Sequence, residues 1–178
     1  MTFYQNMEKK EQTMKITNNF LPPQSFLMVK ALLNSDELPW YFNDHIVSPK
    51  KDPINHTQFT HTFYLNNRPY SNFFRNLSPL LDVIKPSILI RIKANLLPMT
   101  SSIIKHTMHT DLPQFDNAKA TTGIFYINTN NGKTIFETGE EVNSEENKYV
   151  EFDSRKLHTG TSCTDQKRRI VINLNYIK

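Results

Sequence analysis

The sequence predicts a mostly β domain with flanking helices, whose core is a double-stranded β-helix (a jelly roll, cupin-like) buttressed by the N-terminal helices. Two observations lead to this class. In the first half of the chain, apolar residues recur at helical spacing in segments 22–33 and 71–84. From Ser87 onward, short alternating segments separated by polar turns dominate. Helices followed by about eight short strands favour two packed sheets with the helices outside them.

The composition fits one soluble globular domain. At 178 residues and 38% hydrophobic content, the chain can bury a substantial core. A net charge of +4 allows an anionic ligand but favours nucleic acid only weakly, because no basic patch is interleaved with aromatic residues. One cysteine excludes an internal disulfide and indicates a reducing compartment, and no run suits a membrane span or signal peptide. We expect a cytoplasmic protein without membrane contact; its oligomeric state stays open.

The chain begins with a polar segment. Residues 1–13 lack apolar periodicity, so we expect a flexible tail, with Met14 as an alternative natural start and a single domain over 14–178. Residues 15–21 read as a first strand. A helix then follows Pro22 and Pro23, because proline suits the first helical turn.

Segment 39–42 is aromatic and fits either a core plug or a strand that joins the sheet. Residues 46–57 form a loop by composition, and 59–64 alternate like a strand. His56 and His61 are read as ordinary edge or core residues of this region, with metal or substrate contact as the alternative.

The second helical segment and the first strong turn signal come next. Pro79 should bend helix 71–84 or split it into two short helices. The Asn-Gly pair of turn 129–132 predicts a hairpin between strands 124–128 and 134–137, because Asn-Gly suits positive φ. A second polar turn, 143–147, should separate further strands.

Strand 88–96 alternates cleanly. Arg91, Lys93 and Asn95 share one face and the apolar residues share the other. We interpret the Arg91 and Lys93 face as solvated; the alternative places Asn95 near a pocket.

The candidate functional residues begin with His109-Thr110-Asp111. In an extended segment His109 and Asp111 point to the same side, so one distant partner completes a set of two imidazoles and one carboxylate. Such a set on one face of an octahedron suits Fe(II) and leaves three positions free. His158 is the candidate partner, since it follows the strand-like run 149–152 and precedes a glycine.

The last predicted strand, residues 169–176, has an unusually polar face. A face shared by Arg169, Val171, Asn173 and Asn175 is unusual for a core strand unless it lines a polar pocket. A guanidinium matches a carboxylate in a two-pronged arrangement, and 2-oxoglutarate has a distal carboxylate. Arg169 is therefore the first candidate to bind it, with Arg168 on the opposite face as the second, and Asn173 as a further cosubstrate contact.

Residues 88–176 resemble the 2-oxoglutarate/Fe(II)-dependent dioxygenase superfamily, most of all its prolyl 4-hydroxylase-like branch and the small stand-alone members of phage and marine bacterial genomes. The resemblance rests on an ordered series of short motifs: His109-Thr110-Asp111, Thr122 to Asn128, Gly132 to Phe136, Phe152-Asp153-Ser154, His158-Thr159-Gly160 and Arg169 to Asn173.

The resemblance implies roles for further residues. Tyr126 matches the family tyrosine that hydrogen-bonds the distal carboxylate of 2-oxoglutarate, and Asn95 would lie near the pocket. The family places its Arg or Lys nine or ten residues after the distal histidine. The offset of eleven here keeps both Arg169 and Arg168 open.

It also implies an activity: Fe(II), 2-oxoglutarate and O2 would hydroxylate a C–H bond of the substrate with release of succinate and CO2, with ascorbate as reductant. A phage-encoded protein would act in a host cytoplasm. The candidate substrates are a peptidyl residue, proline first, or a nucleobase or small metabolite; a jelly-roll module with an inactive or structural metal site is the alternative from another class.

His106 is expected to face away from His109, and Cys163 to be an ordinary loop residue.

Overall fold

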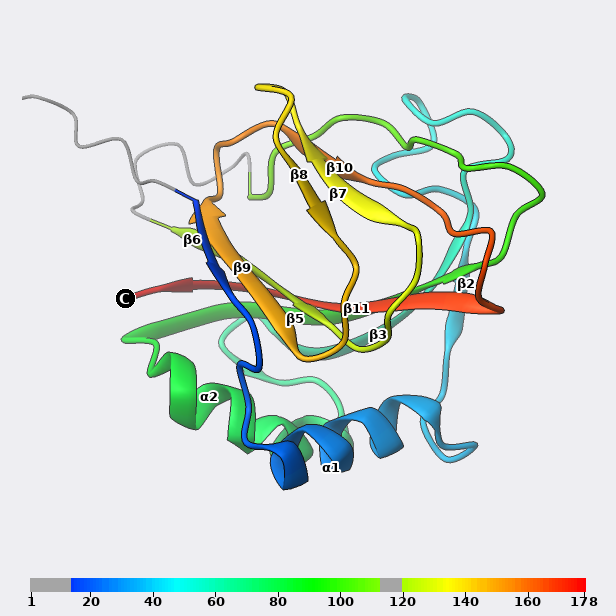
Figure 1. The fold of residues 1–178 in the computed structure, drawn as a ribbon. Coiled ribbons are helices and arrows are strands. Elements are labelled where there is room, and N and C mark those ends of the chain that lie inside the picture. Colours follow the sequence, from blue (N-terminus) through cyan, green and yellow to red (C-terminus); the bar gives the residue numbers. More distant parts are fainter. Residues whose placement is uncertain (1–13, 113–119) are drawn as a thin grey trace, which may run out of the picture.

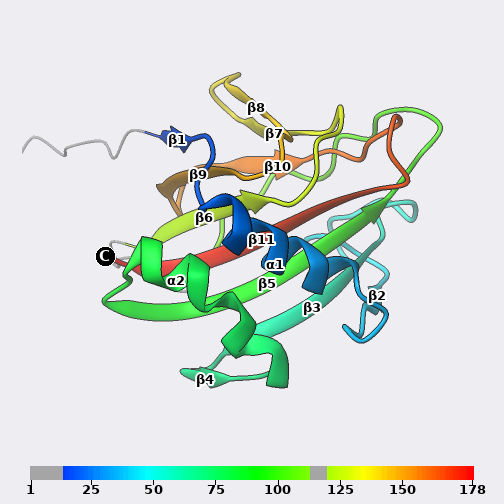
Figure 2. The same cartoon turned by 60° about the horizontal axis from the view of Figure 1, so that its bottom comes forward.

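The structure, a computed structural model, describes residues 14–112 and 120–178 (Figure 1). Two β-sheets face each other, and the helices cover the outer face of the larger sheet (Figures 1 and 2). This arrangement confirms the predicted mostly β, jelly-roll fold with flanking helices. Residues 1–13 lie outside the described residues, so the flexible tail and the single domain over 14–178 stay predictions.

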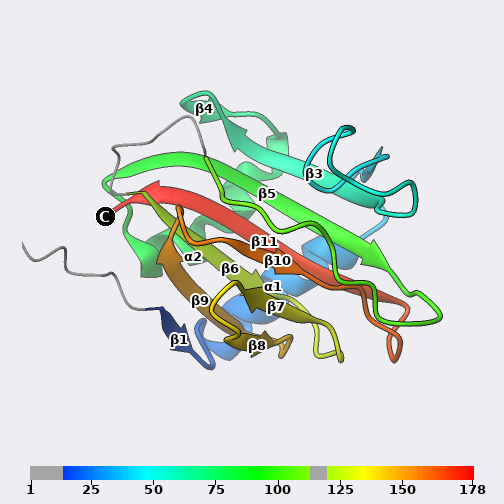
Figure 3. The same ribbon diagram turned by 90° about the horizontal axis from the view of Figure 1, so that it is seen from above.

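The large sheet contains eight strands. Its order along the hydrogen-bonded path is β1 (Lys15–Thr17), β9 (Lys148–Asp153), β6 (Thr121–Tyr126), β11 (Arg168–Ile177), β5 (Ile88–Pro98), β3 (Gln58–Leu65) and β2 (Tyr41–Asn43), with β4 (Arg68–Pro69) paired to β3. All neighbouring strands are antiparallel. The small sheet has the order β10 (His158–Gly160), β7 (Lys133–Phe136) and β8 (Glu141–Asn143), and it lies over the large sheet (Figure 3).

Three helical segments lie beneath the large sheet. Helix α1 (Pro23–Asn34) begins with the expected proline and buries Phe26, Val29 and Leu33, whose spacing places them on one face. A 3-10 helix (Asn72–Leu77) is followed by α2 (Ser78–Ile84). Segment 71–84 is thus split into two short helices, as its proline predicted, because Pro79 fits only the first turn of the second helix.

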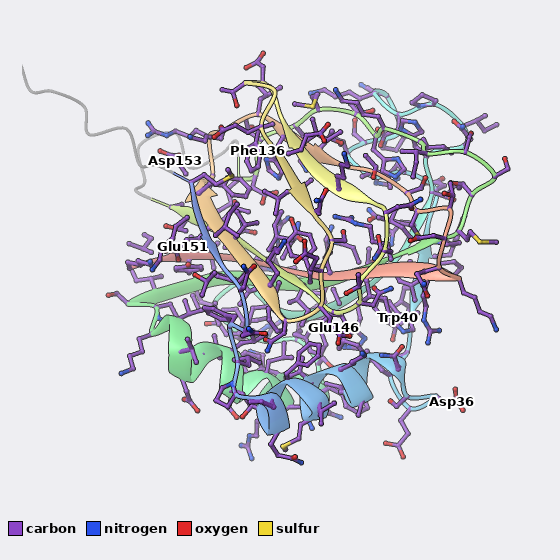
Figure 4. The ribbon with its side chains drawn as sticks, viewed as in Figure 1. Asp36, Trp40, Phe136, Glu146, Glu151 and Asp153 are labelled. Carbon is purple, nitrogen blue, oxygen red and sulfur yellow. The ribbon has the colours of Figure 1, made fainter. Side chains whose placement is uncertain are left out.

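Strand β11 separates the two halves of the interior. Its even-numbered apolar residues, Ile170 to Tyr176, belong to the core between the large sheet and the helices, whereas odd-numbered Arg169 to Asn175 point toward the small sheet. The second, smaller core fills part of the space between the sheets. It includes Phe136 of the small sheet, which is labelled in Figure 4. The strand alternation therefore decides which side chains reach the space between the sheets.

The predicted hairpin between strands 124–128 and 134–137 is wrong. Strand β6 pairs with β11 and β9, while β7 pairs with β10 and β8, so turn 129–132 carries the chain from one sheet to the other. The turn signal is local, but Tyr126 and Phe136 are both buried between the sheets, which requires their strands to face each other. Gly132 is needed for space: a Cβ there would lie 2.7 Å from Arg169 Cδ.

Two N-terminal predictions are refined. The first strand is shorter than residues 15–21, because only Lys15–Thr17 pair with β9. Of the alternatives for residues 39–42, the strand is correct: Tyr41–Asn43 form the edge strand β2. An ion pair from Lys30 of α1 to Glu146 joins the helix layer to the turn before β9 (Figure 4). None of the helices in the described ranges is long and apolar enough to cross a membrane.

Candidate metal centre

A cavity of about 290 Å³ lies between the two sheets. Its floor is made by side chains of β5 and β11 that stand opposite each other in the antiparallel register: Leu97 beside Arg169, Asn95 beside Val171, and Lys93 beside Asn173. Its walls come from the small sheet and from segment 105–112. The solvated face expected for Arg91 and Lys93 is therefore wrong, because the small sheet and this segment cover that face.

The structure brings His109, Asp111 and His158 together, with one potential ligand atom of each within 4.8 Å of the others. His109 lies on an isolated bridge rather than in a regular strand: His109 N donates to His158 O, and His158 N donates to His109 O, both at 2.9 Å. Asp111 N donates to Ser154 O at 3.0 Å. Main-chain bonds thus hold the segment against β10 and the residues before it, and so fix how far apart the three side chains lie.

Main-chain carbonyl groups set the tautomers of both histidines. The Nδ1 atom of His158 lies 2.9 Å from Lys156 O, and that of His109 lies 3.1 Å from Thr107 O. Since a carbonyl only accepts, each Nδ1 carries a proton, and in the neutral ring the lone pair is then on Nε2. His158 Nε2 is buried and has no hydrogen-bond partner within residues 14–112 and 120–178. Burial lowers the pKa of His158 against the opposing effect of the Asp111 charge, which favours the neutral, metal-binding ring.

Asp111 is buried, and its carboxylate is held by three neighbouring strands. Its Oδ1 accepts from Arg91 Nη2 at 3.1 Å, while its Oδ2 accepts from Thr122 Oγ1 at 2.9 Å and from Asn175 Nδ2 at 3.0 Å. Burial alone would raise the pKa of Asp111, but the charges of Arg91 and His158 and the Asn175 hydrogen bond lower it to about 2. The group is a carboxylate at neutral pH, as a metal ligand must be.

Arg169 lies at the other end of the cavity. It is 2% exposed, its Nε donates to Ser144 Oγ at 2.8 Å, and its Nη2 donates weakly to Thr134 Oγ1 at 3.4 Å. A Cβ at Gly160 would lie 3.2 Å from Nη1, so the glycine leaves that end of the guanidinium uncovered. A buried guanidinium that lines a cavity and has no acidic partner in the described part of the chain fits the carboxylate of a bound molecule.

Arg168, the second candidate, lies on the outside. It is exposed, and its Nη2 donates to Asn34 Oδ1 at the end of α1. The strand register therefore favours Arg169.

Tyr126 is fully buried behind the cavity wall. Its hydroxyl donates to Thr134 Oγ1 at 2.7 Å, and Thr134 is the residue that lines the cavity. Burial raises the pKa of Tyr126 to about 12, so the hydroxyl stays protonated. Its direct contact with 2-oxoglutarate stays a prediction.

Asn95 and Asn173 both line the cavity floor. In each, the Oδ1 atom is buried and has no hydrogen-bond partner among the described residues. Each therefore keeps an acceptor for a bound molecule.

The orientation expected for His106 is wrong, because this ring lines the same cavity as His109. Segment 105–109 is irregular, so its side chains do not alternate strictly. Both ring nitrogens of His106 are buried without hydrogen-bond partners among the described residues, and its ring packs edge-on against His56 at 4.9 Å between centroids. Burial, followed by the charges of His56 and Arg169, lowers the pKa of His106 to about 4, so the ring is neutral.

The remaining candidates have structural roles. His61 is buried, with Nδ1 donating to Pro39 O at 2.7 Å and Nε2 accepting from Ser71 Oγ at 2.8 Å. Cys163 is buried in its loop, where its thiol donates to Gln166 O. Neither lines the cavity between the sheets.

The comparisons concern fold. No family model matches the chain, and no curated protein matches it in sequence. Among solved structures, a viral collagen prolyl hydroxylase from Paramecium bursaria Chlorella virus-1, in complex with 2-oxoglutarate, is 10% identical with a TM-score of 0.59, covering 93% of this chain and 96% of that one. A prolyl hydroxylase from Trichoplax adhaerens, bound to a peptide of a hypoxia-inducible factor, is 14% identical with a TM-score of 0.60, over 92% and 83%.

A third similar structure is the non-haem α-ketoglutarate-dependent carbocyclase SnoK of nogalamycin biosynthesis. It is 12% identical with a TM-score of 0.66, over 94% of this chain and 80% of that one. The chain therefore has the fold of the 2-oxoglutarate Fe(II) oxygenases, including the prolyl hydroxylases, as the sequence resemblance predicted. Because these proteins act on both polypeptides and small molecules, the fold does not define a substrate.

Proposed function

We propose that this protein is an Fe(II)- and 2-oxoglutarate-dependent oxygenase that hydroxylates a C–H bond and releases succinate and CO2. One observation carries the proposal: two imidazoles and a carboxylate converge at one end of a cavity whose other end holds a buried guanidinium without an acidic partner in the described chain. This pairing of a facial metal set with a carboxylate anchor matches a chelating keto acid.

The residues fit the iron. His109, Asp111 and His158 supply the two-imidazole, one-carboxylate set that suits Fe(II) with open positions, and the orphaned His158 Nε2 is the atom that a metal would satisfy. Fe(II) with 2-oxoglutarate would supply the oxidant formed from O2. Arg91, Thr122 and Asn175 orient the carboxylate, and two carbonyl groups orient the imidazoles.

The residues also fit the cosubstrate. Arg169, with Thr134 beside it, would bind the distal carboxylate and thereby fix the distance between that end and the metal. The amide groups of Asn95 and Asn173 line the floor between the two ends. Arg169 and Asp111 are both buried, which strengthens the charged contacts that they make.

The substrate is proposed more broadly. A peptidyl residue, proline first, is supported by the two prolyl hydroxylases among the similar structures. A small metabolite is supported by the carbocyclase. A nucleobase is the third candidate, which only the mildly basic composition favours.

The test is aerobic conversion of 2-oxoglutarate to succinate with Fe(II) and ascorbate, against a panel of peptides, nucleosides and amino acids. We expect turnover in the native protein and its loss in His109→Ala and Arg169→Ala. Arg168→Ala is the matched control, because Arg168 is exposed and outside the cavity, and it should keep the native rate. Tightly held zinc, with no succinate under any condition, would instead indicate a non-catalytic metal-binding module.

A further inference from the structure

Lys93 is a cation on the cavity floor. It lies in the middle of β5, on the face shared by Arg91 and Asn95, and stands opposite Asn173 of β11 in the strand register. Burial, followed by the charge of Arg91, lowers the pKa of Lys93 to about 8, so at neutral pH it carries a charge that burial disfavours.

Among the described residues, the charge of Asp111 offsets the Lys93 charge only in part, and no acidic side chain forms an ion pair with Lys93. Asp111 is the acidic residue among the described residues that line the cavity, and Arg91 already pairs with it at 3.1 Å. Within residues 14–112 and 120–178, no ion pair of 4.0 Å or shorter involves Lys93. Lys93 thus lines a polar cavity without an ion-pair partner in the described part of the chain.

The iron and cosubstrate do not remove the imbalance. Fe(II) and the 2-oxoglutarate dianion cancel each other. Counted over the described residues that line it, the cavity contributes the positive charges of Arg91, Lys93 and Arg169 against the negative charge of Asp111, which leaves an excess of two. Buried charges are normally paired. The loaded cavity would therefore still attract an anion.

The side-chain amides beside Lys93 indicate that a hydrogen-bond donor lies next to this anion. The Oδ1 atoms of Asn95 and Asn173 are buried acceptors without partners in the described chain, and these residues flank Lys93 on the floor. Buried acceptors of this kind are satisfied by donors of a bound molecule. The cavity of about 290 Å³ must also hold the cosubstrate, so only a small group of the substrate can enter.

We propose that Lys93 binds a carboxylate of the substrate, and that Asn95 and Asn173 accept hydrogen bonds from an N–H or O–H group next to it. The inference rests on the proposed function and specifies its substrate class: an amino or hydroxy acid, free or as the C-terminal residue of a peptide. A prolyl residue inside a polypeptide, which lacks a carboxylate, does not use this site.

The experiment measures binding without turnover, by calorimetry on the Mn(II)-loaded protein saturated with 2-oxoglutarate. The probes are 2-aminobutyrate and 2-hydroxybutyrate, each against its primary amide, and a tetrapeptide with a free or an amidated C-terminus. We expect the free acids to bind and the matched amides not to bind. Binding of the small acids alone, or of the free peptide as well, distinguishes the two sources of the carboxylate.

Variants connect this binding to the ammonium group. In Lys93→Met the affinity for the bound acid should fall roughly tenfold or more, as expected for loss of a charge-assisted hydrogen bond, with the affinity for 2-oxoglutarate unchanged. Lys93→Arg should keep part of the affinity. Lys133→Met, which removes an exposed lysine paired with Glu141, is the control and should behave as the native protein.

Three results would overturn the inference alone while 2-oxoglutarate still binds the native protein: no probe acid binds, acids and amides bind equally, or Lys93→Met weakens 2-oxoglutarate instead of the acid. The last of these would show that Lys93 serves the cosubstrate. Failure of 2-oxoglutarate to bind the Mn(II)-loaded native protein would overturn the proposed function, and this inference with it.

Discussion

Arg91 Nη2 lies 3.1 Å from Asp111 Oδ1, and Arg91 Nε also donates to Asn175 Oδ1 at 2.9 Å. One guanidinium therefore connects the candidate metal carboxylate to β11 while itself belonging to β5. The second carboxylate oxygen is held by Asn175 and by Thr122 of β6. The orientation of Asp111 is thus set by three adjacent strands of the large sheet, although its own segment belongs to neither sheet.

Removing Arg91 should destabilise the protein and weaken metal binding. In Arg91→Met, Asp111 stays buried but loses its charged partner. Leaving a buried charge unpaired costs more stability than the intact pair contributes. We expect the free energy of unfolding of the metal-free protein to fall by about 1.5–3 kcal/mol, measured by urea denaturation. Mn(II) affinity should fall as well, because the carboxylate is no longer oriented.

The matched control for this loss is Lys133→Met. Lys133 and its partner Glu141 have side-chain exposures of 40% and 44%. The substitution should therefore lower the free energy of unfolding by less than about 1 kcal/mol. Equal stabilities of the Arg91 and Lys133 variants would show that the buried pair does not hold the site together.

Alanine substitutions at two glycines beside Arg169 should distinguish a loss of stability from a loss of cosubstrate binding. A Cβ at Gly132 would lie 2.7 Å from Arg169 Cδ and 2.8 Å from the main-chain oxygen of Ser162, so Gly132→Ala must shift backbone and lower both stability and 2-oxoglutarate affinity. A Cβ at Gly160 meets the Arg169 guanidinium, with Nη1 at 3.2 Å and Cζ at 4.0 Å. Gly160→Ala should therefore weaken 2-oxoglutarate binding with little change in melting temperature; equal losses of stability in both variants would contradict this distinction.

The parts of the structure that depend on local periodicity could be predicted from the sequence. The alternation of β11 placed Arg169 and Asn173 on one face, and that face lines the cavity. Proline chemistry likewise gave the start of α1 and the split before α2. The same alternation could have identified Asn175 as a partner of Asp111, since it shares the face of Arg169.

What could not be predicted depends on how the two sheets pack. The face of Lys93 reads as solvated in an isolated strand and becomes a cavity floor only when the small sheet covers it. The Asn-Gly turn at 131–132 does not reveal which sheet the next strand joins. His106 was misplaced because its segment is held by isolated bridges, in which strict alternation does not apply.

His106 should contribute to cosubstrate binding. Its main-chain N donates to Gly160 O at 3.1 Å, and Gly160 lies against Arg169, so the unpartnered imidazole faces the cavity near the carboxylate anchor. We expect His106→Leu to weaken 2-oxoglutarate binding roughly three- to tenfold through loss of one neutral hydrogen bond. The readout is anaerobic titration of the Fe(II) protein, followed by the visible absorption of the chelated keto acid.

The control measurement for His106→Leu is its melting temperature. Because neither ring nitrogen has a partner in the described chain, replacing the ring by an apolar side chain should not lower the melting temperature. A large drop in melting temperature together with native 2-oxoglutarate affinity would assign His106 a purely structural role. His45→Gln, in the neighbouring loop and outside the cavity, should change neither quantity.

Lys93 should make stability depend on pH in the alkaline range. Its pKa is about 8 in the folded protein against 10.5 as the ordinary value, so between these limits the unfolded chain binds more protons than the folded one. Stability should therefore rise as the pH increases from about 8 to 10.5, by up to about 3 kcal/mol from this group. Urea denaturation of the metal-free native protein and of Lys93→Met over this range measures the difference. The contribution should vanish in Lys93→Met, which should be the more stable protein at pH 7, since it buries no unpaired charge. Parallel stability curves for the two proteins would mean that the ammonium group is already balanced, and would remove the electrostatic reason for a substrate carboxylate at this position.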